Sequence, residues 1–295
     1  MSDQAQKLRE MFSAARQESK IRANAIGVAS GKGGTGKTSF TVNFCLQLAE
    51  KGKRVLLFDF DIGMGNVDIV LGEAPEYSIL DFWQQKLPLQ KVIQKSPAGI
   101  DYIAGGRAFN DFFLPESSEV HSFLHELEQL MDQYDYIFFD MGAGMTKESL
   151  QFLLAADEII LVVTPEPTSL MDAYSAAKHI LLARAESRLS LIINKSSSDK
   201  EAAFAYERIS SVLAKFLSAK VQRLGFLPED SAVSNAVLKR SPVTVSYPKS
   251  KYSKAIRHAA GCFLEERETG FESSHSGNFM ARLKNLLKST AGKGG

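Results

Sequence analysis

The chain has 295 residues, of which 44% are hydrophobic and 23% are charged. This composition is typical of a globular protein and excludes a disordered chain. Its 35 basic and 34 acidic residues leave a formal charge of +1, so the molecule as a whole has no strong attraction for nucleic acid. Because the sequence lacks both a signal-peptide pattern and a run of about 18 apolar residues, we expect a cytoplasmic protein without a transmembrane helix.

Seven short apolar runs separated by helical patterns predict a parallel β-sheet. They are rich in Val, Ile, Leu and Phe, as strands covered on both faces must be, and the alternation is that of βαβ units. We therefore expect one α/β domain with a doubly wound, mainly parallel sheet of about seven or eight strands flanked by helices. The predicted strands are residues 25–30, 54–59, 101–104, 136–140, 158–163, 189–194 and 221–227.

Helical patterns and polar segments divide the rest of the chain. Residues 38–51 predict a helix that ends at Gly52, and residues 169–185 predict one that begins with a capping box of Ser169 and Asp172. The polar stretch 265–277 has no apolar periodicity and predicts a linker. We expect four parts: an N-terminal helix over 1–22, the main domain over 23–267, a linker over 268–277 and a C-terminal helix over 278–295.

A glycine-rich segment lies between the first predicted strand and the first predicted helix. Gly31, Gly36, Lys37 and Thr38 satisfy G-x-x-x-x-G-K-[ST], the P-loop pattern. Backbone N–H groups of such a loop bind phosphates, and the positive end of the following helix dipole adds to the attraction. We expect Lys37 to contact the β- and γ-phosphates and Thr38 to bind Mg²⁺; a simple glycine-rich turn is the alternative. The predicted nucleotide-binding residues here are Gly33, Gly34, Thr35, Gly36, Lys37, Thr38 and Ser39.

The interior of this loop, Lys32-Gly33-Gly34-Thr35, resembles the deviant Walker A pattern K-G-G-x-G-K-[ST] of the MinD/ParA family. The resemblance implies an ATPase that hydrolyses ATP to ADP and phosphate, uses Mg²⁺ and forms a homodimer with ATP. In that family the lysine matching Lys32 contacts the nucleotide of the partner subunit. A cation that arrives on dimer closure would stabilise the charge of the transferring phosphoryl group. Lys32 and Lys37 are thus predicted catalytic residues, although a solvated loop lysine is the alternative for Lys32.

Two further segments that end predicted strands fit the same chemistry. Residues 59–68 resemble the family's switch I pattern D-x-D-x-G-x-x-N-x-D, which implies that Asp61 positions the attacking water. Asp59 is predicted to support Mg²⁺ or its water shell. A solvated turn is the alternative, while calcium is disfavoured because an EF-hand needs an acidic residue at its twelfth position.

The fourth predicted strand ends in Asp140, the Walker B arrangement that supports the metal ion. Gly142 and Gly144 follow and would allow switch II to move. MinD usually carries proline where Gly142 stands, so this form leans away from the division-site protein.

On the opposite side of the predicted site, the family resemblance places Asn194, Pro228 and Glu229 against adenine. An asparagine offers the donor and acceptor that the adenine edge requires, although asparagine after a strand is also common in turns.

The C-terminal segment predicts a short amphipathic helix. From residue 278 onward it contains four basic residues and no acidic one, which fits helices that lie in anionic lipid headgroups and resembles the membrane-targeting helix of MinD-type ATPases. Packing on the protein's own surface is the alternative, and the two arrangements can alternate. Two such helices in a dimer would gain avidity, so we expect reversible peripheral membrane binding that ATP switches on. The predicted membrane residues are Phe279, Met280, Leu283, Leu286, Leu287, Lys284 and Lys288.

The N-terminal segment resembles the activator motif D-Q-A-x-x-L-R of the FlhG family, also called YlxH, MinD-like regulators of flagellar number and placement. The resemblance implies that this segment binds and stimulates the signal-recognition-particle-type GTPase FlhF. Gln4 would order the attacking water, and Leu8 and Arg9 would dock the helix. The family also implies flagellar C-ring or switch-complex proteins as partners. An exposed helix without function is the alternative.

Three other functions compete with this interpretation. A MinD division-site ATPase is the nearest rival, and the N-terminal segment is the feature that only the flagellar function requires. A ParA-like DNA segregation ATPase would need a basic surface that the near-neutral charge does not favour, so we expect no nucleic-acid partner. An iron–sulfur cluster carrier would need bridging cysteines, and the two cysteines, Cys45 and Cys262, are far apart in the sequence.

Overall fold

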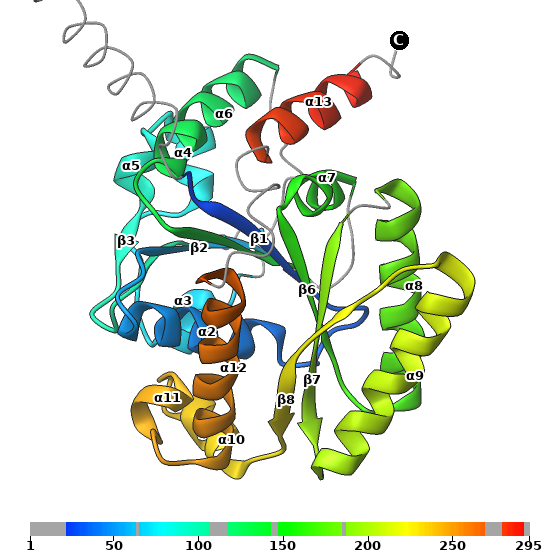
Figure 1. Ribbon diagram of the computed structural model, residues 1–295. Coiled ribbons are helices and arrows are strands. Elements are labelled where there is room, and N and C mark those ends of the chain that lie inside the picture. Colours follow the sequence, from blue (N-terminus) through cyan, green and yellow to red (C-terminus); the bar gives the residue numbers. More distant parts are fainter. Residues whose placement is uncertain are drawn as a thin grey trace, which may run out of the picture.

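An eight-stranded sheet forms the centre of the fold (Figure 1). The computed structural model describes residues 22–62, 65–106, 117–142, 147–184, 187–268 and 279–291. The strand order is β3-β4-β2-β5-β1-β6-β7-β8, and every neighbouring pair is parallel except β3 and β4. The strands are β1 (Asn24–Ala29), β2 (Val55–Phe60), β3 (Gln94–Lys95), β4 (Asp101–Ile103), β5 (Tyr136–Met141), β6 (Glu158–Val163), β7 (Arg188–Ser196) and β8 (Gln222–Pro228).

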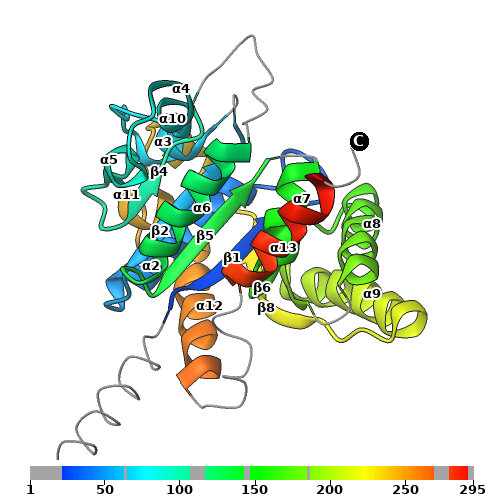
Figure 2. The same cartoon turned by 90° about the horizontal axis from the view of Figure 1, so that it is seen from above.

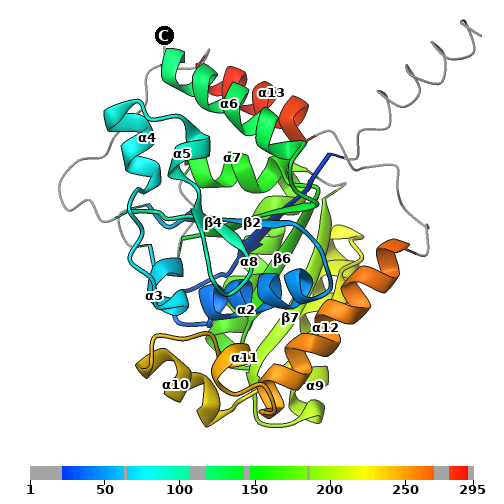
Figure 3. The same ribbon diagram turned by 90° about the vertical axis from the view of Figure 1, so that its left-hand side faces the viewer.

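Helices cover both faces of this sheet, so two hydrophobic cores form (Figure 3). One face carries α2 (Lys37–Glu50), α3 (Val67–Leu71), α10 (Ser231–Leu238), α11 (Val243–Ser246) and α12 (Lys251–Glu268). The other face carries α4 (Ile79–Gln85), α5 (Leu89–Val92), α6 (Ser117–Met131), α7 (Lys147–Ala155), α8 (Pro167–Ala183), α9 (Asp199–Leu217) and α13 (Phe279–Ala291). The predicted doubly wound α/β fold is confirmed.

The alternation of side chains along the central strands feeds both cores. In β5, Phe138 packs into the core beside α2 and α12, whereas its neighbour Phe139 packs into the core on the opposite face. Successive strand side chains point to opposite faces, so a strand in the middle of a two-sided fold must be apolar throughout. This requirement explains why the strands are continuous apolar runs in the sequence.

The seven predicted strands are confirmed, with ends that differ by one or two residues. The eighth, β3, was not predicted because its two residues pair antiparallel with β4 at the sheet edge and are too few to show a pattern. The predicted helix over 38–51 corresponds to α2, and Gly52 follows it with φ 80, a left-handed conformation that glycine adopts without strain.

Two predictions about helix ends were wrong. The capping box of Ser169 and Asp172 does not exist: α8 begins earlier, with Glu166 as its N-cap and Pro167 in its first turn. Proline at the first helical position presets the helical φ, which leaves the Ser169 hydroxyl to accept a hydrogen bond from the Thr164 backbone N–H at 3.0 Å.

The predicted linker also began too early, because α12 continues to Glu268. Arg267 anchors this polar last turn: its guanidinium pairs with the buried carboxylate of Glu158 and lies 3.4 Å from the ring centroid of Phe263. Ion pairs of the partly buried Arg267, and of Arg188 with Glu266, thus anchor a stretch that lacks apolar periodicity. The remaining predicted linker residues, 269–277, lie outside the described part of the chain.

None of the helices within the described ranges is both long and apolar enough to pass through a membrane.

Candidate active site

The loop between β1 and α2 lies at the carboxyl edge of the parallel strands, where α/β sheets bind their ligands. Gly36 is the N-cap of α2 and has φ 85, a conformation that favours glycine. Gly31 lies so close to α8 that an added Cβ would be 2.3 Å from the carbonyl carbon of Asp172. The spacing of glycines is therefore required by the backbone of the cradle and by its packing.

Asp140, at the end of β5, organises the inner wall of the site. Its buried carboxylate accepts hydrogen bonds from Lys37 Nζ at 2.9 Å, Thr38 Oγ1 at 2.7 Å and Thr41 Oγ1 at 3.1 Å. Three side chains from the first turns of α2 thus meet at one carboxylate of β5, about a hundred residues further along the chain. The oxygen donors of Thr38 and Asp140 fit Mg²⁺, which usually takes one or two protein oxygens and completes its shell with phosphate and water. When bound, the ion would offset the negative charge of the phosphates.

Asp59, at the end of β2, holds the loop that follows it. Its carboxylate accepts hydrogen bonds from the backbone N–H groups of Asp61, Asn66 and Val67 at 2.9 to 3.1 Å. Burial, reinforced by the negative charge of Asp140, raises the pKa of Asp59 to about 7. The structure therefore gives Asp59 a role in fixing switch I, and its predicted contact with Mg²⁺ or the water shell stays a prediction.

Asp61 directly follows β2 and lies near Lys37 and Asp140. Its side chain is half-buried, and a Cβ added to Gly142 would be 2.8 Å from Asp61 Oδ1, so switch I and switch II are in contact. Burial raises the pKa of Asp61, while the charge of Lys37 opposes that shift. Gly144, the other predicted switch II residue, lies outside the described residues.

Lys32 makes an ion pair that the sequence did not predict. Its ammonium lies 2.6 Å from Glu166 Oε2 and 3.0 Å from Thr168 Oγ1, both at the beginning of α8. The Lys32 and Glu166 side chains are 31% and 64% exposed, so the pair lies at the rim of the site. The hydrogen bond from Lys32 and its positive charge lower the pKa of Glu166.

The residues predicted to bind adenine lie together at the ends of β7 and β8. Asn194 is buried, and its Nδ2 donates to the carbonyl oxygen of Thr35 in the P-loop at 2.7 Å. The Glu229 backbone N–H donates to the Ser196 carbonyl at 2.8 Å, which joins the two loops. Asn194 therefore supports the P-loop, and its predicted contact with adenine stays a prediction.

The predicted membrane helix α13 is docked on the protein's own surface, beside α6 and α7 (Figure 2). The side chains of Phe279, Met280 and Leu283 are buried, and those of Leu286 and Leu287 are partly buried against the same core. Lys284 Nζ donates to Glu128 at 2.7 Å, and Arg282 pairs with Asp157. In this structure α13 therefore packs on the protein's own surface, and the apolar face that was predicted to meet lipid is covered. Of the predicted membrane residues, Lys288 is exposed to solvent.

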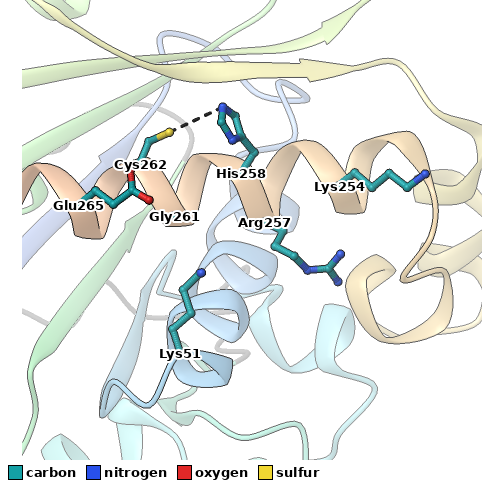
Figure 4. A pocket seen from close by; sticks show the side chains of 7 residues that line it. All are labelled: Lys51, Lys254, Arg257, His258, Gly261, Cys262 and Glu265. Atoms are coloured by element: carbon teal, nitrogen blue, oxygen red, sulfur yellow. Dashed lines mark hydrogen bonds between the residues drawn. The ribbon is translucent and has the colours of Figure 1, made fainter.

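A basic hollow of about 370 Å³ lies elsewhere, beside α12 (Figure 4). Lys51, which follows the last residue of α2, points toward α12, whereas the P-loop is at the opposite end of α2. The hollow is thus separate from the phosphate cradle. It is lined by Lys51, Lys254, Arg257, His258, Gly261, Cys262 and Glu265.

Two residues of the site were not predicted from the sequence: Thr41 and Glu166. Thr41 lies one helical turn after Lys37 on the same face of α2, and that spacing could have indicated it. Glu166 follows the carboxyl end of β6, but its pairing with Lys32 has no signal in the sequence. The predicted partner-activation residues Gln4, Leu8 and Arg9 lie outside the described residues.

Comparisons with known proteins agree with this geometry. Residues 26–243 match the CobQ/CobB/MinD/ParA nucleotide binding domain family. The chain is 32% identical to the antiactivator FleN of Pseudomonas aeruginosa, over 80% of this chain and 84% of that protein. It is 29% identical to the flagellum site-determining protein YlxH of Helicobacter pylori, over 98% and 99% of the two chains.

Solved structures of cell-division proteins share the fold. The MinC:MinD complex of Aquifex aeolicus gives a TM-score of 0.68 at 27% identity, covering 86% of this chain and 100% of that one. The Pyrococcus furiosus cell division ATPase MinD gives 0.67 at 26% identity, covering 83% and 99%. The chain therefore belongs to the CobQ/CobB/MinD/ParA family of nucleotide-binding proteins, and within it is an ATPase that resembles FleN and YlxH.

Proposed function

We propose that this chain is an ATP-driven switch of the FlhG type, which regulates flagellar number and placement. In this proposal Mg·ATP closes a homodimer, the dimer attaches to anionic membrane, and hydrolysis returns the monomer. The observation that carries the proposal is the P-loop with Lys32 at its rim, in a chain that resembles two flagellar proteins over most of its length.

Lys32 is suited to leave its present partners when a dimer forms. Ion pairs exposed to solvent contribute little to stability, and both side chains of the Lys32–Glu166 pair retain access to solvent. The free-energy cost for Lys32 to leave Glu166 and to bind a phosphate group on the opposite subunit is therefore small. Lys37 and Asp140, which are buried, remain as the fixed part of the site.

The position of α13 supports regulated membrane binding. Its buried apolar face cannot insert into lipid while it packs on α6 and α7, and two of its basic residues are paired with Glu128 and Asp157. Docking and membrane binding therefore exclude each other. An ATP-dependent change that weakens docking would release a helix suited to anionic headgroups.

The two carboxylates that hold α13 provide a direct test of membrane regulation. We expect the double variant Glu128→Gln/Asp157→Asn to bind anionic liposomes about threefold to tenfold more than the wild type without nucleotide, since it weakens docking and leaves α13 itself unchanged. Asparagine retains the acceptor for the Ala25 backbone N–H, which Asp157 Oδ2 binds at 2.9 Å. Sedimentation with phosphatidylglycerol vesicles measures the effect.

The wild type supplies the control for nucleotide dependence in that assay. It should sediment with the vesicles in ATP more than in ADP. Equal sedimentation of the ADP and ATP forms would reject the coupling, and a double variant that binds no better than wild type would reject docking as the restraint.

Stimulation of the GTPase FlhF distinguishes this proposal from a MinD function. We expect deletion of residues 1–20 to remove the stimulation of FlhF while ATP hydrolysis changes less than twofold, because the described P-loop site uses no residue before Ser30. The measurement is GTP turnover by FlhF at increasing concentrations of each variant. Full stimulation by the truncated chain would reject the role of residues 1–20, and no stimulation by either chain would favour MinD.

Interaction with flagellar C-ring or switch-complex proteins is part of the same proposal and rests on the family. The rival ParA-like function predicts a salt-sensitive DNA mobility shift that requires ATP. Binding of that kind would replace the flagellar proposal by a segregation function.

A further inference from the structure

One face of α12 lines the basic hollow over most of the length of the helix. Its residues Lys254, Arg257, His258, Cys262 and Glu265 follow one another at intervals of three or four, so they lie on the same side of the helix. At 1.5 Å per residue, the helix from Lys254 to Glu265 is about 16 Å long. The hollow is therefore bordered by an elongated strip of side chains.

The cations of this strip have bonding capacity to spare. Neither Lys51 nor Lys254 forms an ion pair with any residue of the described ranges, and both side chains are exposed. Arg257 donates from Nε to Oε1 of the buried Gln47 at 3.1 Å. That bond orients the guanidinium, and its two terminal nitrogens remain for an oxygen acceptor that arrives from outside.

Gly261 leaves space in the middle of the strip. It lies inside α12 without a positive φ, and an added Cβ would meet only Lys51 Nζ, at 3.9 Å. Neither the backbone nor the packing therefore requires glycine here, although glycine destabilises a helix interior relative to alanine. Its effect is to leave room beside the Lys51 ammonium, which points toward α12 (Figure 4).

The arrangement of charge favours a row of carboxylates over phosphate groups. Lys254 and Arg257 are spread along α12, and Lys51 comes from the carboxyl end of α2, where the helix dipole is negative. Such a site suits single charges spaced along a chain better than one compact phosphate. Nucleic acid is disfavoured, because Glu265 adds a negative charge and none of the described side chains that line the hollow is aromatic.

We propose that this hollow is a docking site for an acidic segment of a partner protein, whose Asp or Glu carboxylates pair with Lys51, Lys254 and Arg257. The site lies at the end of α2 opposite to the phosphate cradle, so the segment and a nucleotide occupy the chain together. Because the attraction is between exposed charges, the affinity falls as the salt concentration rises.

Fluorescence anisotropy of a labelled hexaglutamate peptide tests this site on the full chain, with excess Mg·ADP present to occupy the P-loop. Lys51→Ala/Lys254→Ala removes the two unpaired cations. Gly261→Gln fills the hollow without a change of charge, and the space around the added Cβ lets the helix keep its fold. Lys91→Ala/Lys200→Ala, at exposed lysines of α5 and α9, is the matched control. Labelled hexaglutamine is the neutral probe.

We expect Lys51→Ala/Lys254→Ala to weaken hexaglutamate binding about tenfold and Gly261→Gln about threefold, with the control variant within twofold of wild type. Unchanged affinity in both hollow variants, or an equal loss in the control variant, would overturn the inference. Hexaglutamine that binds as tightly as hexaglutamate would overturn it too. So would inorganic phosphate or single-stranded DNA that depends on these residues while hexaglutamate does not bind.

Discussion

Replacing Lys37 by alanine is expected to abolish detectable ADP binding and to lower the free energy of unfolding by about 3 kcal/mol. Lys37 Nζ lies 2.9 Å from Asp140, and both side chains are buried. Removing one partner of a buried ion pair costs about 3 to 5 kcal/mol, because the remaining charge is left without compensation. Because Thr38 and Thr41 still donate hydrogen bonds to the same carboxylate, we expect the loss of stability to lie at the lower end of this range. Urea unfolding and calorimetry with Mg·ADP measure the two effects.

The double variant Lys37→Ala/Asp140→Asn separates stability from binding. Neutralising the stranded carboxylate should recover most of the lost stability, since hydrogen-bonded neutral groups are tolerated in the interior far better than an unpaired charge. Nucleotide binding should not return, because the cation for the phosphates is still missing. A single Lys37→Ala variant as stable as wild type, or one with unchanged ADP affinity, would contradict the role of this pair.

The parts of the site that could be predicted from the sequence depend on local geometry. The glycines of the P-loop, the apolar strands and the polar residues after them are each specified within a few positions, and parallel strands bring their carboxyl ends to one edge. This is why Lys37, Thr38 and Asp140 could be placed together, and the structure joins them by hydrogen bonds.

The unpredicted features depend on contacts between distant segments. Glu166 is 134 residues from Lys32, and nothing in either neighbourhood indicates the other. The apolar face of α13 was evident, but amphipathicity states only that one face is covered and not what covers it. For Asp59, a carboxylate after a strand is equally suited to a metal ion or to backbone N–H groups, and only the path of switch I decides which it meets.

Replacing Asp61 by alanine is expected to reduce the rate of ATP hydrolysis about 100-fold with ATP affinity within threefold of wild type. A positioned side chain that orients or deprotonates the nucleophile contributes roughly 10² to 10⁴ in rate. Asp61 is half-buried beside Gly142, and its carboxylate is close enough to Lys37 and Asp140 for both charges to affect its pKa. It does not bond to the cradle in the way that Lys37, Thr38 and Asn194 do, so binding should survive. Phosphate release under saturating ATP measures the rate.

Two controls make the role of Asp61 specific. Asp199→Ala removes an exposed aspartate in the first turn of α9, far along the chain from the switches, and should leave the hydrolysis rate within twofold. Asp61→Asn retains the size of the side chain and tests whether the negative charge is needed. If Asp61→Asn and Asp61→Ala both hydrolyse ATP within threefold of wild type, water positioning must come from another group. If only Asp61→Asn hydrolyses ATP within threefold of wild type, a hydrogen bond that orients the water is sufficient, and the carboxylate does not act as a base.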